Sequence, residues 1–118
     1  MILPDDAEQL RQRLREEVDA GTDIIFTTGG TGIGPRDITP DVVTDFADKL
    51  IPGVMEQVRA KCAAKNPNAI LSRSVAAVKN QTLIYTLPGS VKAVNEYTPE
   101  IMKTLEHAIC MLNNLDTH

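Results

Sequence analysis

Apolar residues recur at helical spacing in four parts of the chain. Such spacing places them on one face of a helix, which can then pack against a core. The four stripes consist of Ala7, Leu10, Leu14 and Val18; Val43, Phe46, Ala47 and Leu50; Val54, Met55, Val58 and Cys62; and Ile101, Leu105, Ile109 and Leu112. Gly21 should end the first helix, and Pro52-Gly53 should separate the second from the third. Thr98-Pro99 should restart the final helix with a new cap.

Short runs without helical spacing predict three strands. Ile24-Ile25-Phe26 lies between Asp23 and a group of glycines, which is typical of a strand buried on both faces in a parallel sheet. The runs at 74–78 and 82–86 are separated by only three residues, so they can form a hairpin. Alternating helices and strands of this kind indicate an α/β fold.

Two of the predicted strands lead through a tight turn into a helix. Four glycines within six residues, from Gly29 to Gly34, follow the first strand, and Thr39-Pro40-Asp41 then has the residues of a helix start with Thr39 as the N-cap. The strand at 82–86 leads in the same way through Pro88-Gly89-Ser90. If these strands are parallel neighbours, both turns lie at the sheet edge where α/β proteins bind ligands, and they line one pocket.

Composition narrows the classes of function. The 118 residues, 42% hydrophobic and 24% charged, suit one globular domain over 1–118. The net charge of −4 and the absence of Trp argue against nucleic-acid binding. No apolar run approaches the roughly 20 residues that span a bilayer, and no signal peptide is visible. Cys62 and Cys110 lack metal-site spacing, so we expect a reduced, cytoplasmic setting.

The glycine-rich loop could bind an oxyanion through its backbone amides. It lacks the Gly-Lys-Ser/Thr sequence of a P-loop, and its third glycine is one position short of the dinucleotide fingerprint. Backbone N–H groups and the dipole of the following helix could nevertheless hold a phosphate. The alternative is a turn that only reverses the chain.

The charged residues near this loop allow two interpretations each. Arg36 could clamp a phosphate and Asp37 could bind magnesium, but a surface salt bridge would account for both equally well. Asp5 and Asp6 precede the first helix, where at least one should act as an N-cap. A second carboxylate from this segment, at the same sheet edge as Asp37, would complete a site for a magnesium-bound triphosphate.

Polar residues near the second turn and the two histidines are less specific. Ser90 could cap the following helix or donate to a ligand, and Lys92 could be solvated or contact a phosphate. His107 and His118 have no recognisable serine or cysteine partner, so they do not indicate a catalytic triad. We expect both histidines to be structural or exposed, and we expect both cysteines to lie in the core.

The segment Thr-Gly-Gly-Thr-Gly at 28–32 resembles the molybdopterin-binding family, which includes bacterial molybdopterin adenylyltransferase and the N-terminal domain of gephyrin. The similarity continues through Pro-Arg-Asp-Ile-Thr-Pro-Asp at 35–41 and resumes at 52–53, 69–73 and 87–93. Ile2 to Asp6 also resembles the family's Pro-Asp segment. The resemblance covers nearly the whole chain in the right order.

This resemblance implies a three-layer α/β/α domain with a mostly parallel sheet and a short hairpin, assembled as a homotrimer. It implies that molybdopterin attacks the α-phosphate of magnesium-ATP, so that adenylyl-molybdopterin forms and pyrophosphate leaves. Asp5 and Asp37 would be the catalytic carboxylates and the Mg²⁺ ligands. The substrate-binding residues implied by the motifs are Thr28, Gly29, Gly30, Thr31, Gly32, Arg36, Pro88, Gly89, Ser90 and Lys92. Neither nucleic acid nor a membrane is an implied partner.

One departure from the family pattern concerns the start of the chain. Family members begin with a strand carrying a Ser-Asp motif, followed by a helix and a second strand, and this sequence lacks that unit. We therefore expect an N-terminally incomplete domain that exposes sheet edges and apolar surface. Two alternatives to the enzyme stay open, a molybdopterin-binding module without catalysis and a trimeric scaffold domain.

Overall fold

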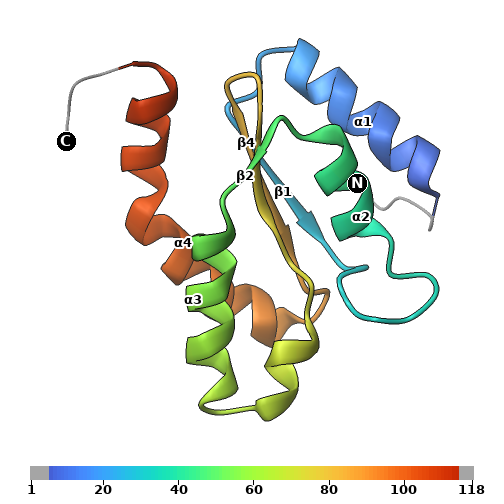
Figure 1. Cartoon of the computed structure of the whole chain (residues 1–118), viewed down its shortest axis with the longest axis vertical. Coiled ribbons are helices and arrows are strands. Elements are labelled where there is room, and N and C mark those ends of the chain that lie inside the picture. Colours follow the sequence, from blue (N-terminus) through green and yellow to red (C-terminus); the bar gives the residue numbers. More distant parts are fainter. Residues whose placement is uncertain (1–5, 115–118) are drawn as a thin grey trace.

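The computed structural model describes residues 6–114, which form helices and strands in alternation (Figure 1). The elements are α1 (Ala7–Asp19), β1 (Ile24–Thr28), α2 (Thr39–Phe46), β2 (Lys49–Leu50), α3 (Pro52–Ala63), the 3₁₀ helix η1 (Pro67–Leu71), β3 (Ala76–Lys79), β4 (Thr82–Leu87) and α4 (Val91–Leu112). The predicted α/β class is confirmed. Among these elements, no helix is both long and apolar enough to cross a membrane.

The four strands form one mixed sheet in the order β1-β4-β3-β2. β1 runs parallel to β4, with Ile24 opposite Leu83 and Thr28 opposite Leu87. β3 pairs antiparallel with both β4 and β2, and the predicted hairpin between β3 and β4 is confirmed. The described strands are therefore less parallel than expected, because only the β1–β4 pair has that orientation.

Helices cover both faces of the sheet, which confirms the three-layer architecture (Figure 1). On one face, α1 and α2 pack against Ala77 and Ile84 through a cluster that includes Leu14 and Val43. On the other face, α3 and α4 pack against the opposite side of the same strands. That cluster consists of Met55, Val58, Cys62, Ala76, Val78, Leu83, Tyr85, Leu87, Tyr97, Ile101 and Leu105. The alternation of side chains along each strand thus supplies two cores from one sheet.

β1 is only partly buried, which corrects the prediction that it is buried on both faces, and it lies at the edge of the described sheet. Phe26 is 43% exposed, although its ring stacks on Tyr85 of β4 with centroids 5.5 Å apart. β1 therefore has one neighbour, β4, in the described sheet, and part of its apolar surface is exposed. A strand with only one neighbour leaves half of its backbone polar groups without a ladder partner.

The sequence prediction misplaced both ends of the second helix, which ends at Phe46, before Ala47 and Leu50. Leu50 belongs to β2 and not to the second helix, because Asp48 and Ile51 donate backbone hydrogen bonds to β3 carbonyls and hold the segment extended. Thr39 is the first residue of α2, so its N-cap is Ile38, which makes no side-chain capping bond.

The final helix is continuous from Val91 to Leu112, with Pro99 inside it. The predicted restart at Thr98 is therefore wrong. Proline removes one backbone donor from a helix interior, and it usually bends the helix. Thr98 Oγ1 donates to the Val94 carbonyl at 2.7 Å, a bond within the helix that replaces the predicted cap.

Candidate functional site

The two strand-to-helix turns meet at the carboxyl ends of β1 and β4, as the sequence predicted. Gly29 donates its N–H to the Leu87 carbonyl at 2.8 Å and so extends the ladder by one residue. A Cβ atom placed on Gly89 would lie 3.3 Å from Gly29 Cα. The two backbones are therefore in close contact, and the absence of a side chain at Gly89 keeps that contact open.

The turns line two separate cavities among the described residues, which corrects the prediction of one shared pocket. Thr28, Gly29 and Gly30 line a cavity of about 520 Å³ that is bounded by α1 and the edge of β1. Pro88, Ser90 and Lys92 line a smaller cavity of about 200 Å³ on the α3–α4 side of the sheet. Gly29 and Gly89 lie in close contact between these two cavities.

Gly30 holds the glycine loop against the start of α2. Its φ of +69° lies in the left-handed region that favours glycine, and its carbonyl accepts the Thr39 N–H at 3.2 Å. A Cβ atom at this position would lie 2.5 Å from Thr39 Oγ1, closer than real contacts allow. The glycine at this position is thus required both by the backbone and by the neighbouring side chain.

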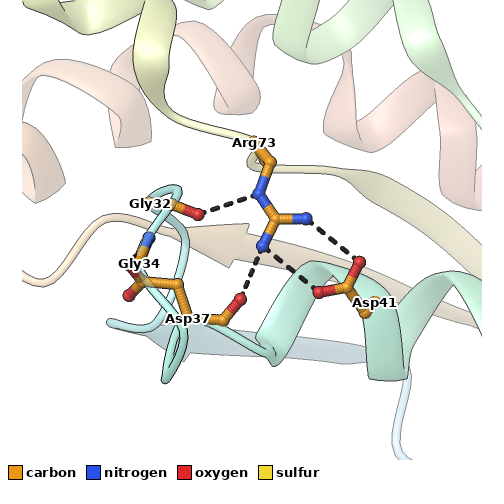
Figure 2. Close-up of polar contacts among 5 residues, drawn as sticks. All are labelled: Gly32, Gly34, Asp37, Asp41 and Arg73. Atoms are coloured by element: carbon orange, nitrogen blue, oxygen red, sulfur yellow. Dashed lines mark hydrogen bonds and ion pairs between the residues drawn. The ribbon is translucent and has the colours of Figure 1, made fainter.

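The carboxylate of Asp37 lies against the glycine loop (Figure 2). Its Oδ2 accepts the Gly34 N–H at 2.8 Å. Cβ atoms on Gly32 and Gly34 would lie 2.8 and 2.9 Å from the same oxygen, so these glycines make room for the carboxylate. Arg36 is exposed on the same loop. The structure therefore brings Asp37 together with the predicted loop residues.

Arg73, just before β3, donates several hydrogen bonds to the glycine loop and the residues after it. Its backbone N–H donates to the Thr31 carbonyl at 2.7 Å, and its Nε donates to the Gly32 carbonyl at 2.8 Å. The guanidinium also reaches the main-chain carbonyl of Asp37 and both carboxylate oxygens of Asp41, as Figure 2 shows. The hydrogen bond from Arg73 is the main cause that lowers the pKa of Asp41 below its usual value.

The sequence indicated no individual role for Arg73, and its segment, 69–73, was named only as part of the family resemblance. Its partners stand more than 30 positions earlier, so no local spacing connects them. Only the residue type could have pointed to Arg73, because the planar guanidinium of arginine can donate to several carbonyls at once.

Thr31 is buried and faces the protein interior. It is 4% exposed, and Ser72 Oγ lies 3.5 Å from its hydroxyl and 3.0 Å from the hydroxyl of buried Ser74. This row of hydroxyl groups fixes the loop to the segment before β3. In this arrangement a ligand would reach the backbone of Thr31 more readily than its side chain.

Ser90 is the N-cap of α4, so the capping interpretation is confirmed. Its Oγ accepts the Ala93 N–H at 3.1 Å, and its hydroxyl hydrogen can still be donated. Exposed Lys92 follows in the first turn and lines the 200 Å³ cavity. Tyr97 also lines this cavity, and its buried hydroxyl has no hydrogen-bond partner among the residues the structure describes.

The remaining predicted residues fall partly outside the described chain. Asp5 and His118 lie outside residues 6–114. Asp6 is the N-cap of α1 and accepts the backbone N–H groups of Glu8 and Gln9, which confirms the capping interpretation for one of the two aspartates. Within 6–114, no three His, Cys, Asp or Glu side chains are grouped as a metal site.

The sequence predicts that the two cysteines lie in the core and that His107 is structural or exposed. Cys62 is buried and Cys110 is half-buried, and both thiols are free. Burial is the main cause that raises the pKa of Cys62 above its usual value, so this thiol is not activated. His107 is exposed on α4.

Fold and site together define a three-layer α/β domain whose glycine-rich loop lies at the carboxyl ends of two parallel strands. The family model described as "Probable molybdopterin binding domain" matches residues 1–107. The chain therefore belongs to this molybdopterin-binding family, as the sequence resemblance indicated.

Individual relatives agree with this assignment. Molybdopterin adenylyltransferase of Haemophilus influenzae is 43% identical over 80% of this chain, and Dictyostelium discoideum gephyrin is 35% identical over 96% of it. The alignment spans 49% of the bacterial protein and 16% of gephyrin, so this chain corresponds to about half of the former.

Solved structures show the same fold. The Mog protein of Mycobacterium ulcerans superposes with a TM-score of 0.87 at 36% identity, over 91% of this chain and 70% of that one. The enzyme MoaB of Thermus thermophilus also gives a TM-score of 0.87, at 39% identity over 94% of this chain and 70% of that one. Both are described as molybdopterin-biosynthesis proteins.

Proposed function

We propose that this domain acts in molybdenum cofactor biosynthesis by transferring an adenylyl group from ATP to molybdopterin. A terminal phosphate oxygen of molybdopterin would attack the α-phosphorus of ATP, and the bond to pyrophosphate would break. The observation that carries the proposal is the Asp37 carboxylate held against a glycine loop at the end of β1. Curated relatives named molybdopterin adenylyltransferase at 32–43% identity support it.

The chain's own groups suit the binding of phosphates. The loop offers backbone amides, the hydroxyl of Ser90 can donate from the N-terminus of α4, and Lys92 carries a positive charge in the same turn. Substrate positioning and charge neutralisation account for most of the rate enhancement in reactions of this type. These groups therefore supply binding and orientation, and none has to form a covalent bond.

Magnesium fits this site as a partner of the substrate. Mg²⁺ is commonly held by one or two carboxylates together with substrate phosphates. In the described residues, Asp37 uses Oδ2 for the Gly34 N–H, and no hydrogen bond to its Oδ1 is recorded. Asp37 and Asp5 would hold the ion, and the bound ion would neutralise phosphate charge.

The assembly and setting of the protein belong to the same proposal. We infer that residues 1–118 act as one domain, since two cores share a single sheet. A homotrimer follows only from the family resemblance. Two free cysteines support a reduced, cytoplasmic setting.

The test combines the purified chain with molybdopterin and magnesium-ATP. Mass spectrometry should detect adenylylated pterin and pyrophosphate in equal amounts. Pterin that binds without either product would contradict the enzyme and support the binding module. Trimers with no affinity for pterin would support the scaffold.

Asp37→Asn should abolish adenylyl transfer and retain pterin binding. The amide oxygen of asparagine can still accept the Gly34 N–H, so the loop keeps its shape while the negative charge is lost. Asp19→Asn is the matched control, because α1 ends at Asp19 before β1 begins, whereas the glycine loop follows the end of β1. Unchanged turnover in Asp37→Asn, or loss in both variants, would refute the role of Asp37.

A further inference from the structure

Arg73 contacts the glycine loop at three main-chain carbonyls. The main-chain N–H of Arg73 donates to the Thr31 carbonyl at 2.7 Å, and its guanidinium donates to the carbonyls of Gly32 and Asp37 at 2.8 and 2.5 Å. We propose that Arg73 is a positioning residue, which turns the backbone amides of Gly32 and Ile33 outward so that they bind a phosphate oxyanion. The inference rests on the proposed function, because it assigns the direction of donors in the same site.

The geometry of the peptide bond carries this inference. In a trans peptide the N–H of one residue points away from the C=O of the residue before it. Because the Thr31 and Gly32 carbonyls point to Arg73, the N–H groups of Gly32 and Ile33 point away from it. Neither amide has a recorded acceptor in the described chain. Two adjacent amides that point the same way form the kind of concavity that binds anions.

The positive charge of Arg73 is already paired, so we do not propose that its guanidinium binds the phosphate directly. Its guanidinium is paired with both carboxylate oxygens of Asp41, at 3.0 and 3.2 Å, as Figure 2 shows. This pair is partly exposed, with 37% of the Arg73 side chain and 64% of the Asp41 side chain accessible. Exposed ion pairs contribute little to folding stability. The pair with Asp41 alone would therefore give an Arg73 substitution only a small effect on stability.

Two substitutions separate the carbonyl contacts from the ion pair. Arg73→Lys keeps a positive charge but loses the planar fork, so it cannot donate to both Gly32 and Asp37 as arginine does. Asp41→Asn weakens the ion pair and leaves the carbonyl contacts in place. Arg59→Lys is the matched control, because Arg59 Nη1 donates to the Ser74 carbonyl at 2.8 Å, outside the glycine loop.

The experiment measures binding of inorganic pyrophosphate by calorimetry, together with amide chemical shifts by ¹⁵N NMR. In the wild type, pyrophosphate should shift the Gly32 and Ile33 amide signals. Arg73→Lys should weaken binding by roughly tenfold or more, which corresponds to about 1.4 kcal/mol. Asp41→Asn and Arg59→Lys should stay within about twofold of the wild type, since they leave the loop carbonyls bound.

These outcomes are independent of adenylyl transfer. A chain that binds pyrophosphate in an Arg73-dependent way but forms no adenylylated pterin would refute the proposed enzyme and support the positioning role. Wild-type affinity in Arg73→Lys would overturn the inference. So would a wild-type spectrum in which pyrophosphate leaves the Gly32 and Ile33 signals unmoved. An equal loss in Arg59→Lys would show that Arg73 acts only through general stability.

Discussion

Replacement of Gly30 by alanine should destabilise the fold in two separable ways. The φ of +69° puts alanine in the left-handed region, which costs about 1–2 kcal/mol. The new Cβ atom would also lie 2.5 Å from Thr39 Oγ1, and such overpacking costs about 1–3 kcal/mol. The total expected loss in the free energy of unfolding is therefore about 2–5 kcal/mol.

Two other glycines provide matched controls for the backbone part. Gly29 has φ +91° and Gly21 has φ +82°, and a Cβ atom on either would meet nothing within 4 Å. Gly29→Ala and Gly21→Ala should thus lose only about 1–2 kcal/mol. Alanine also lowers the entropy of the unfolded chain by the same amount in all three variants, so that effect cancels in the comparison.

Urea unfolding measures these differences directly. A loss of about 2 kcal/mol lowers the urea midpoint by about 1 M for a slope near 2 kcal/mol per molar. Thr39→Ala removes the hydroxyl that overlaps the new Cβ atom, so Gly30→Ala should cost less in that background by about 1–3 kcal/mol. Equal losses for Gly30→Ala and Gly29→Ala, or no relief from Thr39→Ala, would refute the role of the close contact.

The buried hydroxyl of Tyr97 and the acidic side chain of Asp48 give two further predictions. Tyr97→Phe should keep the free energy of unfolding or raise it by up to about 1 kcal/mol in thermal unfolding, because the hydroxyl has no partner in the described chain. The pKa of Asp48 is lowered, chiefly by the Asn80 N–H and then by Lys79. Its stabilisation is complete above its ordinary pKa of 3.8 and is lost as pH falls through the lowered pKa. Asp48→Asn should therefore lose less stability than the wild type in unfolding curves between about pH 5 and pH 2, and an equal loss would contradict this.

The local sequence pattern was sufficient to predict those elements that bury one regular apolar face. The stripes in α1 and α3 and the β3–β4 hairpin followed from spacing and turn length, because each buries a regular apolar face. The pattern failed where distant contacts decide. Leu50 continues a helical stripe, yet pairing of β2 with β3 holds it in a strand. Periodicity also cannot show how many neighbours a strand has, so the edge position of β1 was missed.

The candidate site likewise has features that local sequence predicts and features that depend on distant contacts. The two turns and the position of Asp37 beside the glycines could be predicted, because strand–turn–helix order places them at one sheet edge. The separation into two cavities could not, since it depends on the distance between Gly29 and Gly89. The contacts of Arg73 join segments that become neighbours only after the sheet has formed.

The pairing of β1 with β4 also has a consequence for the order of folding. The turn between β3 and β4 contains two residues, whereas Ile24 and Leu83, which pair in β1 and β4, are separated by roughly 60 residues of chain. Closing the longer loop costs more entropy, and non-local contacts of this kind slow folding. We therefore expect β1 to dock onto a preformed hairpin, a sequence that pulsed hydrogen exchange would reveal as late protection of β1 amides. Because Gly29 contacts Gly89 only once β1 has docked, we expect the glycine loop to reach its final shape late in folding.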